Sequence, residues 1–483
     1  MLDLFSHLTK NEIIEFEKFI KSPYYNTDKT IVKIFENLKK INANYNSDLN
    51  SETELFKELN LDNSKRNRLS KQFRSLLKYF LKLKEFEKDE NTNMMYELRA
   101  LREKKFTTHY KKKLNEFIKI FDNKFKRDEN YYSNRIIIED DYYNFTINEK
   151  ALDYPDILNT KRDNIIYNFY FQLLHCYNDM ILHEEYAGKK FDLKFPYLNE
   201  ILNDIKLNFE KIQNEHPNIC IIYYIISIQL SMRKNQSTIE LEKLYLKYLE
   251  ANLNKFDKTQ LFHYYLYIVN YYILMLHKGN YDYRQKLFDI YFFQEKNDFL
   301  LLNNEINAES FRDVVSIATS TGNLDWAQYF IEKYKKLLNY DKNKDFINLS
   351  YAKIYFIKKN YNKSISHLIL VGSRNISNYV SAKIIFCKIY YEQKNISAIE
   401  FELDNLRKLE KRNKKINELN KSSIDNFTKY IKQLIKINTL EFMHDKKFQE
   451  LAEFSYDEIN KLHYFIPEKN WFLEKFQSKF KNK

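Results

Sequence analysis

The sequence predicts an all-α protein, and its turn residues are the first observation behind that prediction. Its 483 residues include only four glycines and five prolines, while 44% are hydrophobic. Average usage would supply roughly 34 glycines and 24 prolines, and a sheet protein needs many of them at its tight turns. Helices joined by short polar connections suit this composition, and the hydrophobic content is ample for a continuous core.

The second observation is one pattern that occurs twice between residues 348 and 409. Each copy has a small residue (Ala352 or Cys387) before an aromatic pair, followed by a Lys-Asn turn, a bulky residue and another small residue. The copies are offset by about 35 residues, close to the ~34 of a tetratricopeptide repeat. The sequence therefore predicts a tetratricopeptide-like right-handed solenoid of helical hairpins.

Similar turns extend this pattern toward the N-terminus. They are Lys234-Asn235, Gly279-Asn280, Gly322-Asn323, Lys359-Asn360 and Lys394-Asn395. Glycine and asparagine tolerate the left-handed conformation that ends many helices. Because the spacing is uneven, we expect a degenerate repeat array over residues 196–483, capped by a C-terminal helix that carries Trp471 and Phe476.

A small N-terminal helical domain is predicted for residues 1–90. Thr9 and Glu12 form a capping-box pattern, so the first helix should begin near residue 10, and Asp28 should open the second. A loop over 42–52, a short helix over 53–60 and a basic helix over 64–86 follow. Residues 91–195 form a helical linker or hairpin region, with three helices over 93–150 and a long one over 157–186.

The long helix over 157–186 has apolar residues on a wide face. Ile165, Phe169 and Cys176 belong to one stripe, and Ile166 and Tyr177 belong to its neighbour. A face this wide predicts burial between two neighbouring elements.

The cysteines and the longest apolar run indicate the compartment. Cys176, Cys220 and Cys387 are odd in number and far apart, so we expect small buried residues in a reducing environment. The run over 261–276 contains His263 and Asn270 and is too short and too polar for a membrane span. We expect a cytoplasmic protein without a membrane span or a signal peptide.

Catalytic, cofactor and metal motifs are missing from the sequence. It has no GxxxxGK[ST], GxGxxG, CxxC or HExxH pattern. Asp179 and His183 have the spacing of two metal ligands, but a solvated helix end is the favoured interpretation. His175 beside Cys176 is interpreted as a core imidazole, and the acidic run over 139–141 as an exposed face. We therefore predict a protein that is not an enzyme, with no cofactor and no metal.

Basic residues gather on the helix over 64–86. Residues 65–84 contain no acid, and the chain has a net charge of +13. The candidate phosphate contacts are Lys65, Arg66, Arg68, Lys71, Arg74 and Lys78. A short helix, a turn and a longer basic helix match the arrangement of a helix-turn-helix reader of nucleic acid. The alternative is a solvated face in a lysine-rich chain.

The repeats offer a different candidate site. In tetratricopeptide-like stacks the first helix of each hairpin lines a groove, and corresponding positions here carry Lys353 and Lys388. The candidate groove residues are Phe346, Leu349, Lys353, Phe356, Ile384, Lys388 and Tyr391. The two lysines would hold a carboxylate or an acidic peptide. Alternatively, the aromatic residues belong to the repeat core and the lysines hold nothing.

Parts of the sequence resemble a known family. These parts are Leu8-x-x-x-Glu12-x-x-x-Phe16-x-x-Phe19, the run Ser-Pro-Tyr-Tyr-Asn at 22–26, the run at 97–106 and Tyr131-Tyr132. Together they are similar to an uncharacterised family of large helical proteins from Bacteroidetes-type bacteria. The resemblance implies tetratricopeptide-like helical repeats and no established activity.

The sequence thus predicts a non-catalytic scaffold or adaptor that binds a protein or peptide partner through a repeat groove. The alternative is a nucleic-acid-associated protein that uses the basic helix over 65–84. These two hypotheses place the functional surface at different ends of the chain.

Overall fold

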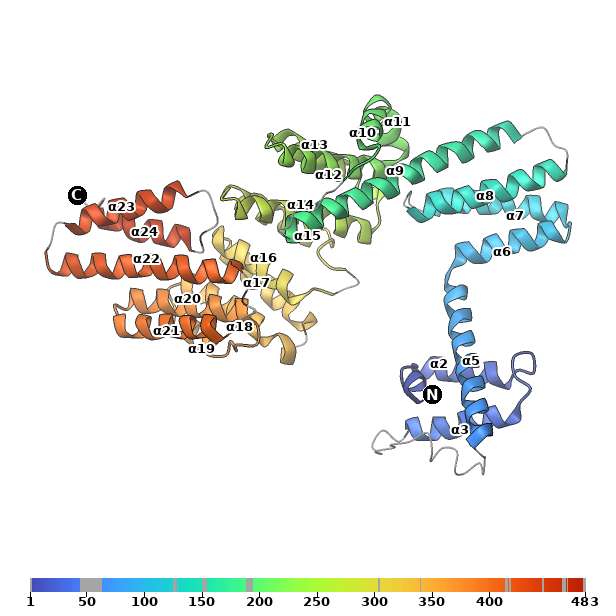
Figure 1. The fold of residues 1–483 in the computed structure, drawn as a ribbon, viewed down its shortest axis with the longest axis horizontal. Coiled ribbons are helices and arrows are strands. Elements are labelled where there is room, and N and C mark those ends of the chain that lie inside the picture. The colour runs from blue at the N-terminus through green and yellow to red at the C-terminus, as the bar shows by residue number, and fades with distance from the viewer. Residues whose placement is uncertain are drawn as a thin grey trace. The chain divides into compact units, whose positions relative to one another are not determined.

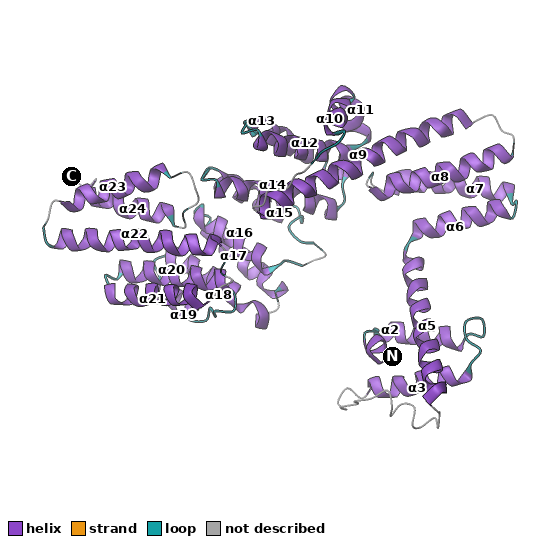
Figure 2. Cartoon of the chain, in the orientation of Figure 1, coloured by secondary structure: helices purple, strands orange, loops and turns teal. Residues whose placement is uncertain are grey.

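The computed structural model describes residues 2–43, 63–124, 127, 129–149, 154–187, 194–302, 305–338, 340–412, 416, 418–444, 447–462, 466 and 468–480. Every regular element within these residues is a helix, as Figures 1 and 2 show. The prediction of an all-α protein is therefore confirmed. The predicted short helix over 53–60 and most of the predicted loop over 42–52 lie outside the described residues.

The chain divides into two compact units, an N-terminal unit (Met1–Ile222) and a C-terminal unit (Tyr223–Lys483). The helices of the N-terminal unit are α1 (Leu2–Ser6), α2 (Lys10–Lys21), α3 (Lys29–Ala43), α5 (Asn63–Lys88), α6 (Glu90–Glu103), α7 (Thr107–Lys124), α8 (Glu129–Asn148), α9 (Tyr154–Ala187), α10 (Leu198–Leu207) and α11 (Phe209–Glu215). The boundary falls within α12 (Pro217–Arg233).

The C-terminal unit continues from α12 to the last described residues. Its helices are α13 (Ile239–Ala251), α14 (Lys258–His277), α15 (Tyr283–Lys296), α16 (Ala308–Ser320), α17 (Leu324–Tyr334), α18 (Tyr340–Ile357), α19 (Tyr361–Leu368), α20 (Ile376–Glu392), α21 (Ile396–Arg412), α22 (Glu418–Phe442), α23 (Lys447–Lys461) and α24 (Lys469–Phe480). Short 3₁₀ turns follow α13 and α17 at Leu253–Lys255 and Lys335–Leu337.

Helix α2 begins where the capping-box pattern predicts. The Thr9 hydroxyl accepts from the Glu12 backbone N–H at 3.3 Å, and the Glu12 carboxylate accepts from the Thr9 N–H at 2.8 Å. These two bonds satisfy backbone donors that a helix start leaves without partners. The apolar face of α2 then packs Phe16 against Phe73 of α5, with ring centroids 5.6 Å apart and both rings fully buried.

The expected burial of the long helix α9 is wrong for its first stripe, and in the second stripe it is correct for Tyr177 but not for Ile166, which is 37% exposed. Ile165 and Phe169 are 46% and 47% exposed, and Cys176 is also exposed. The face that is buried carries Tyr167, Phe171, Leu174, Tyr177 and Ile181. Because apolar residues surround most of this helix, their period alone does not select a face. The expected burial of all three cysteines is correct for Cys220 and Cys387 only.

The five predicted turns all contain a left-handed residue. These residues are Asn235, Gly279, Gly322, Lys359 and Lys394, with φ between 52° and 88°. After each one, the next backbone N–H bonds a carbonyl five residues earlier, as Asn395 does to Tyr390 at 2.9 Å. This is the Schellman ending of a helix. At the first turn the motif lies one residue later than the sequence alignment placed it, because Asn235 and not Lys234 is left-handed.

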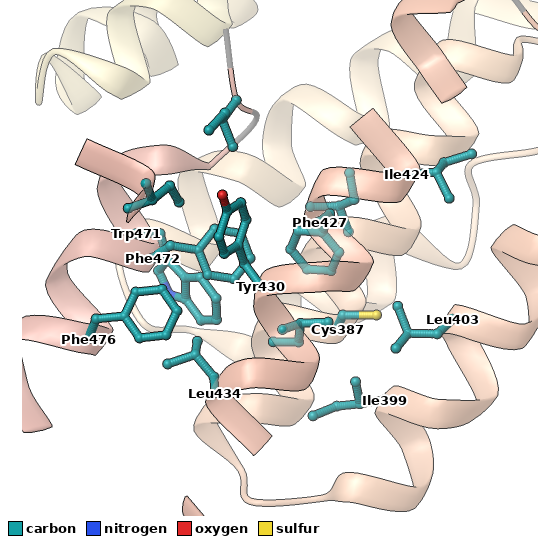
Figure 3. Close-up of a cluster of buried hydrophobic side chains, with 14 of the residues drawn as sticks. Cys387, Ile399, Leu403, Ile424, Phe427, Tyr430, Leu434, Trp471, Phe472 and Phe476 are labelled. Atoms are coloured by element: carbon teal, nitrogen blue, oxygen red, sulfur yellow. The ribbon is translucent and has the colours of Figure 1, made fainter. Parts of the chain in front are cut away.

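Alternate helices of the C-terminal unit pack side by side. Helix α18 contacts both α16 and α20, and α20 also contacts α22, while each helix also contacts its sequence neighbours. The C-terminal part of this row has one continuous core. Figure 3 shows that Cys387 of α20, Phe427 and Tyr430 of α22, and Phe472 and Phe476 of α24 gather there.

A further property concerns membranes. Among the described residues, no helix is long and apolar enough to cross one.

Candidate functional site

The predicted groove residues fall into two groups in the structure. Phe346, Leu349 and Ile384 are at most 6% exposed and belong to the interior. Lys353, Phe356 and Tyr391 are half-buried, and Lys388 is buried with its ammonium group in contact with a carboxylate. Those four residues lie on α18 and α20. We call the surface that they form the candidate binding face, and they are the groove residues that a ligand could contact.

Four cations from four helices are close enough to act on Glu468 or on Lys353, and we call them the cationic cluster. They are Arg284 of α15, Arg312 of α16, Lys353 of α18 and Lys388 of α20. The Lys353 ammonium donates to the Ser316 hydroxyl at 2.5 Å, which fixes α18 against α16. Burial and the nearby Arg312 guanidinium lower the pKa of Lys353 to about 8. Burial is the larger of these two causes, and repulsion from the Arg312 guanidinium adds to it.

Glu468 supplies the carboxylate that this face already holds. It precedes α24 and forms an ion pair with Lys388. Its side chain remains 33% exposed, so solvent reaches it. Burial opposes the charge of Glu468, yet Lys388, Lys353 and Arg284 together hold the pKa of its carboxyl below the ordinary value. The single carboxylate of Glu468 therefore interacts with three members of the cationic cluster.

Aromatic rings surround the Lys388–Glu468 pair. The Lys388 ammonium lies 4.3 Å from the ring centroid of Phe356 and 5.4 Å from that of Trp471. The Trp471 indole N–H donates to Glu392 at 3.2 Å, and its ring meets Tyr391 with centroids 5.3 Å apart. These rings attract the ammonium through their negative faces while they keep part of the water away.

The segment with Glu468 also contacts the residues at the start of α15. The Tyr281 hydroxyl accepts from the Ile466 backbone N–H at 3.4 Å. The guanidinium of Arg284 lies 4.8 Å from the Tyr281 ring centroid, and the Lys469 ammonium lies 5.1 Å from it. Ile466 and Lys469 thus contact Tyr281 just before α15, while Glu468 pairs with Lys388 of α20.

Positive charge exceeds negative charge on this face. Arg312 has its own partner in Asp313, with 2.8 Å between nitrogen and oxygen, and Asp313 also attracts Lys353. Lys475 is similarly paired with Glu392 at 2.7 Å. Since Lys353 and Arg284 share Glu468 with Lys388, the cationic cluster keeps excess positive charge. Such a surface attracts anions.

Comparisons with protein-family models, curated proteins and solved structures find no match to this chain.

The basic helix over 64–86 corresponds to α5 of the N-terminal unit. Lys65, Arg68, Lys71, Arg74 and Lys78 are all exposed on it, while Arg66 is half-buried. Arg68 lies 3.9 Å from Asp28, and Arg74 donates to the Ser70 carbonyl at 3.3 Å. Most of the predicted phosphate contacts therefore share an outward surface, opposite the side of α5 that buries Leu69, Phe73 and Leu77.

The acidic run over 139–141 was expected to be an exposed face, and this is wrong. Glu139 is 4% exposed and pairs with Arg135 at 2.6 Å, while Asp141 pairs with Arg102 at 2.9 Å. Asp140 contacts Lys161 of α9. Successive residues of a helix point about 100° apart, so each carboxylate meets a different neighbour. Because each of the three carboxylates has a basic partner, we interpret them as groups that stabilise the packing of the helices.

The remaining candidates for chemistry lie on α9. His175 packs on Phe171 with ring centroids 4.4 Å apart, and burial lowers the pKa of its imidazole. Its neighbour Cys176 points elsewhere and is exposed. Within the residues that the structure describes, no three His, Cys, Asp or Glu side chains, those of Asp179 and His183 included, are placed to hold a metal ion.

Sequence reasoning missed Glu468, Arg284 and Arg312. Glu468 and Lys388 are 80 residues apart, so no local pattern relates them. Arg284 and Arg312 lie on helices whose repeats are too degenerate to align with the clear pair. The available signal was the pair of lysines at corresponding repeat positions, 353 and 388.

Proposed function

We propose that this chain is a non-catalytic scaffold or adaptor that holds an acidic segment of a partner protein against the cationic cluster. The observation that carries the proposal is the contact between Lys388 and Glu468. A carboxylate from a segment far along the chain already pairs with this lysine, whose ammonium group also lies over the rings of Phe356 and Trp471. A partner's carboxylates would be attracted in the same way by Lys353 and Arg284.

We infer that the helices from α14 to α21 are tetratricopeptide-like hairpins in a right-handed stack, with the cationic cluster on its concave side. The Schellman endings at Gly279, Gly322, Lys359 and Lys394 support this inference, as does the row of α16, α18 and α20. Stacked hairpins of this kind present extended binding surfaces. The resemblance to Bacteroidetes-type helical proteins agrees with this arrangement, and we propose a cytoplasmic location.

Charged and apolar residues of this face would make different contributions to binding. The cations accelerate encounter with an acidic segment and fix its orientation. The rings of Phe356 and Tyr391, both half-buried, leave apolar surface beside the charges. A segment that alternates acidic and apolar residues matches both features, whereas a wholly acidic one would leave the rings uncovered.

The test is affinity capture from native lysate with quantitative mass spectrometry. We expect the double variant Lys353→Glu, Arg284→Glu to retain at most about a tenth of the partner bound by the wild type, since reversed charges repel an acidic segment. The matched control is Lys258→Glu, Lys461→Glu, two lysines that are 72% and 79% exposed elsewhere on the unit. Thermal melts verify that each variant is folded. A folded double variant that still captures the partner would refute the assignment of this face.

A second candidate function is nucleic-acid binding by α5. The exposure of Lys71, Arg74 and Lys78 on one side of the helix, in a stretch without acids, favours it. Phosphate contacts of this kind weaken steeply with salt. Nucleic acid that co-purifies at low salt, leaves at high salt and is lost on Lys71→Glu, Lys78→Glu would support it. Protein that is free of nucleic acid at low salt would exclude it.

A further inference from the structure

The cationic cluster holds donors that its own carboxylates do not use. Asn378 of α20 is completely buried, and its amide oxygen accepts from Arg312 at 3.3 Å. Its amide nitrogen has no hydrogen-bond partner. A buried N–H without an acceptor is costly, so this donor marks a place that an acceptor would stabilise.

Lys353 has spare donors close to the same point. An ammonium group carries three N–H donors, and Ser316, one helical turn after Arg312, accepts one of them. Arg312 acts electrostatically on Lys353, so the two charges are near one another. Lys353, Arg312 and Asn378 thus bring two cations and an unused amide N–H to the junction of α16, α18 and α20.

The charge in this region favours a doubly charged ligand. Glu468 is shared among Lys388, Lys353 and Arg284, and Asp313 is shared between Arg312 and Lys353. A single further carboxylate would leave positive charge uncompensated. A phosphoryl group carries about −1.5 to −2 charges at pH 7 and presents three acceptor oxygens in a compact tetrahedron. It therefore matches both the charge and the donors.

We propose that the junction of α16, α18 and α20 is a binding site for a phosphoryl group, held by Lys353, Arg312 and the Asn378 amide and attracted by Arg284 and Lys388. This rests on the proposed function, because the phosphoryl group would belong to a phosphorylated residue in the partner's acidic segment. The phosphate oxygens accept hydrogen bonds, and no covalent step is involved.

The site is tested by titrating the full chain with O-phosphoserine at constant ionic strength. Calorimetry measures the affinity, and the shift in Tm measures the stabilisation by the bound ligand. Inorganic phosphate is the second probe, and acetate is the monoanionic control. We expect both phosphates to raise the Tm and acetate to leave it unchanged. The Lys353→Met variant should weaken phosphoserine binding by about tenfold or more, since a charge-assisted hydrogen bond is lost. Lys353→Arg, which keeps the charge, should restore most of the affinity.

One control variant and one further test variant complete the experiment. Lys461→Met removes a lysine that is 79% exposed and should leave binding unchanged. Asn378→Asp removes the unused donor in favour of a negative charge, and should abolish phosphate binding in a folded protein. Equal Tm shifts for wild type and Lys353→Met, or an acetate effect equal to that of phosphate, would overturn the proposal.

Capture of the partner from a phosphatase-treated lysate tests the phosphoryl site independently of the proposed scaffold function. If phosphatase treatment of the lysate releases a partner that the double variant Lys353→Glu, Arg284→Glu also fails to bind, both stand. If the partner remains bound after complete dephosphorylation, the phosphoryl site is refuted while the scaffold function survives.

Discussion

Left-handed residues end several helices of the C-terminal unit, and two of them are lysines. Lys359 and Lys394 have φ of 57° and 58°, where Gly279 and Gly322 occupy the equivalent places in earlier turns. The sequence predicted these turns because glycine and asparagine favour such endings. It did not predict which residue of each pair is left-handed, since that depends on where the last helical hydrogen bond forms.

The Lys394→Gly variant should be more stable than the wild type. A side chain at positive φ crowds the following carbonyl, and glycine removes that contact. Relief of a left-handed penalty of about 1 to 2 kcal/mol is offset in part by the greater freedom of glycine in the unfolded chain, about 0.5 to 1 kcal/mol. We therefore expect the free energy of unfolding to rise by about 0.5 to 1 kcal/mol. Urea denaturation measures the change. The control is Lys432→Gly within α22, where glycine should lower the same free energy by about 1 kcal/mol. A loss of stability for Lys394→Gly would contradict this interpretation of the turn.

Buried carboxylates join successive helices of the C-terminal unit. Glu242 of α13 is 2% exposed and accepts from Tyr271 and Tyr283 at 2.7 Å each and from Lys286 at 3.0 Å. Glu295 of α15 similarly accepts from Lys333 of α17 at 2.7 Å. Sequence patterns place a glutamate on the outer face of a helix by default. Only the later tyrosines and lysines, tens of residues away, make burial favourable.

Glu242→Gln should destabilise the C-terminal unit and reduce its sensitivity to acid. Burial opposes the charge, but the bonds from Tyr271, Tyr283 and Lys286 prevail and lower the pKa of Glu242. A lowered pKa contributes stability that is present at neutral pH and lost as the pH falls below about 4.5 through the folded-state value. At pH 7 we expect a loss of about 2 kcal/mol, typical for a charged hydrogen-bond partner.

Chemical denaturation at pH 7 and at pH 4 measures this effect. The matched control is Glu240→Gln, two residues earlier and exposed on the other side of α13, which should change the free energy by less than about 0.5 kcal/mol. If Glu242→Gln and Glu240→Gln behave alike, the buried carboxylate does not join these helices.

At the scale of the whole molecule, composition and capping patterns predicted the fold class and most helix positions. Few turn residues exclude sheets, and capping residues such as Thr9 act locally. The binding face was less accessible to prediction. Lys353 and Lys388 were found because they repeat, whereas Phe346, Leu349 and Ile384 were placed in the groove although they are buried. An apolar stripe in the sequence does not show whether its residues line a groove or belong to the core beneath it. Glu468 could not be predicted because only long-range packing brings it next to Lys388.

Site-specific photo-crosslinking distinguishes a partner bound at the cationic cluster from one bound elsewhere on the C-terminal unit. A photoreactive residue at Ser320, exposed one turn beyond Ser316 on α16, samples the face with the cationic cluster. The same residue at Phe401, which is 64% exposed on α21, provides the control. We predict a crosslink from Ser320 to an acidic segment of a protein partner, lost when Lys353 and Arg284 are changed to glutamate, and no such product from Phe401. Crosslinks from Phe401 alone, or a Ser320 product that survives the charge reversal, would contradict it.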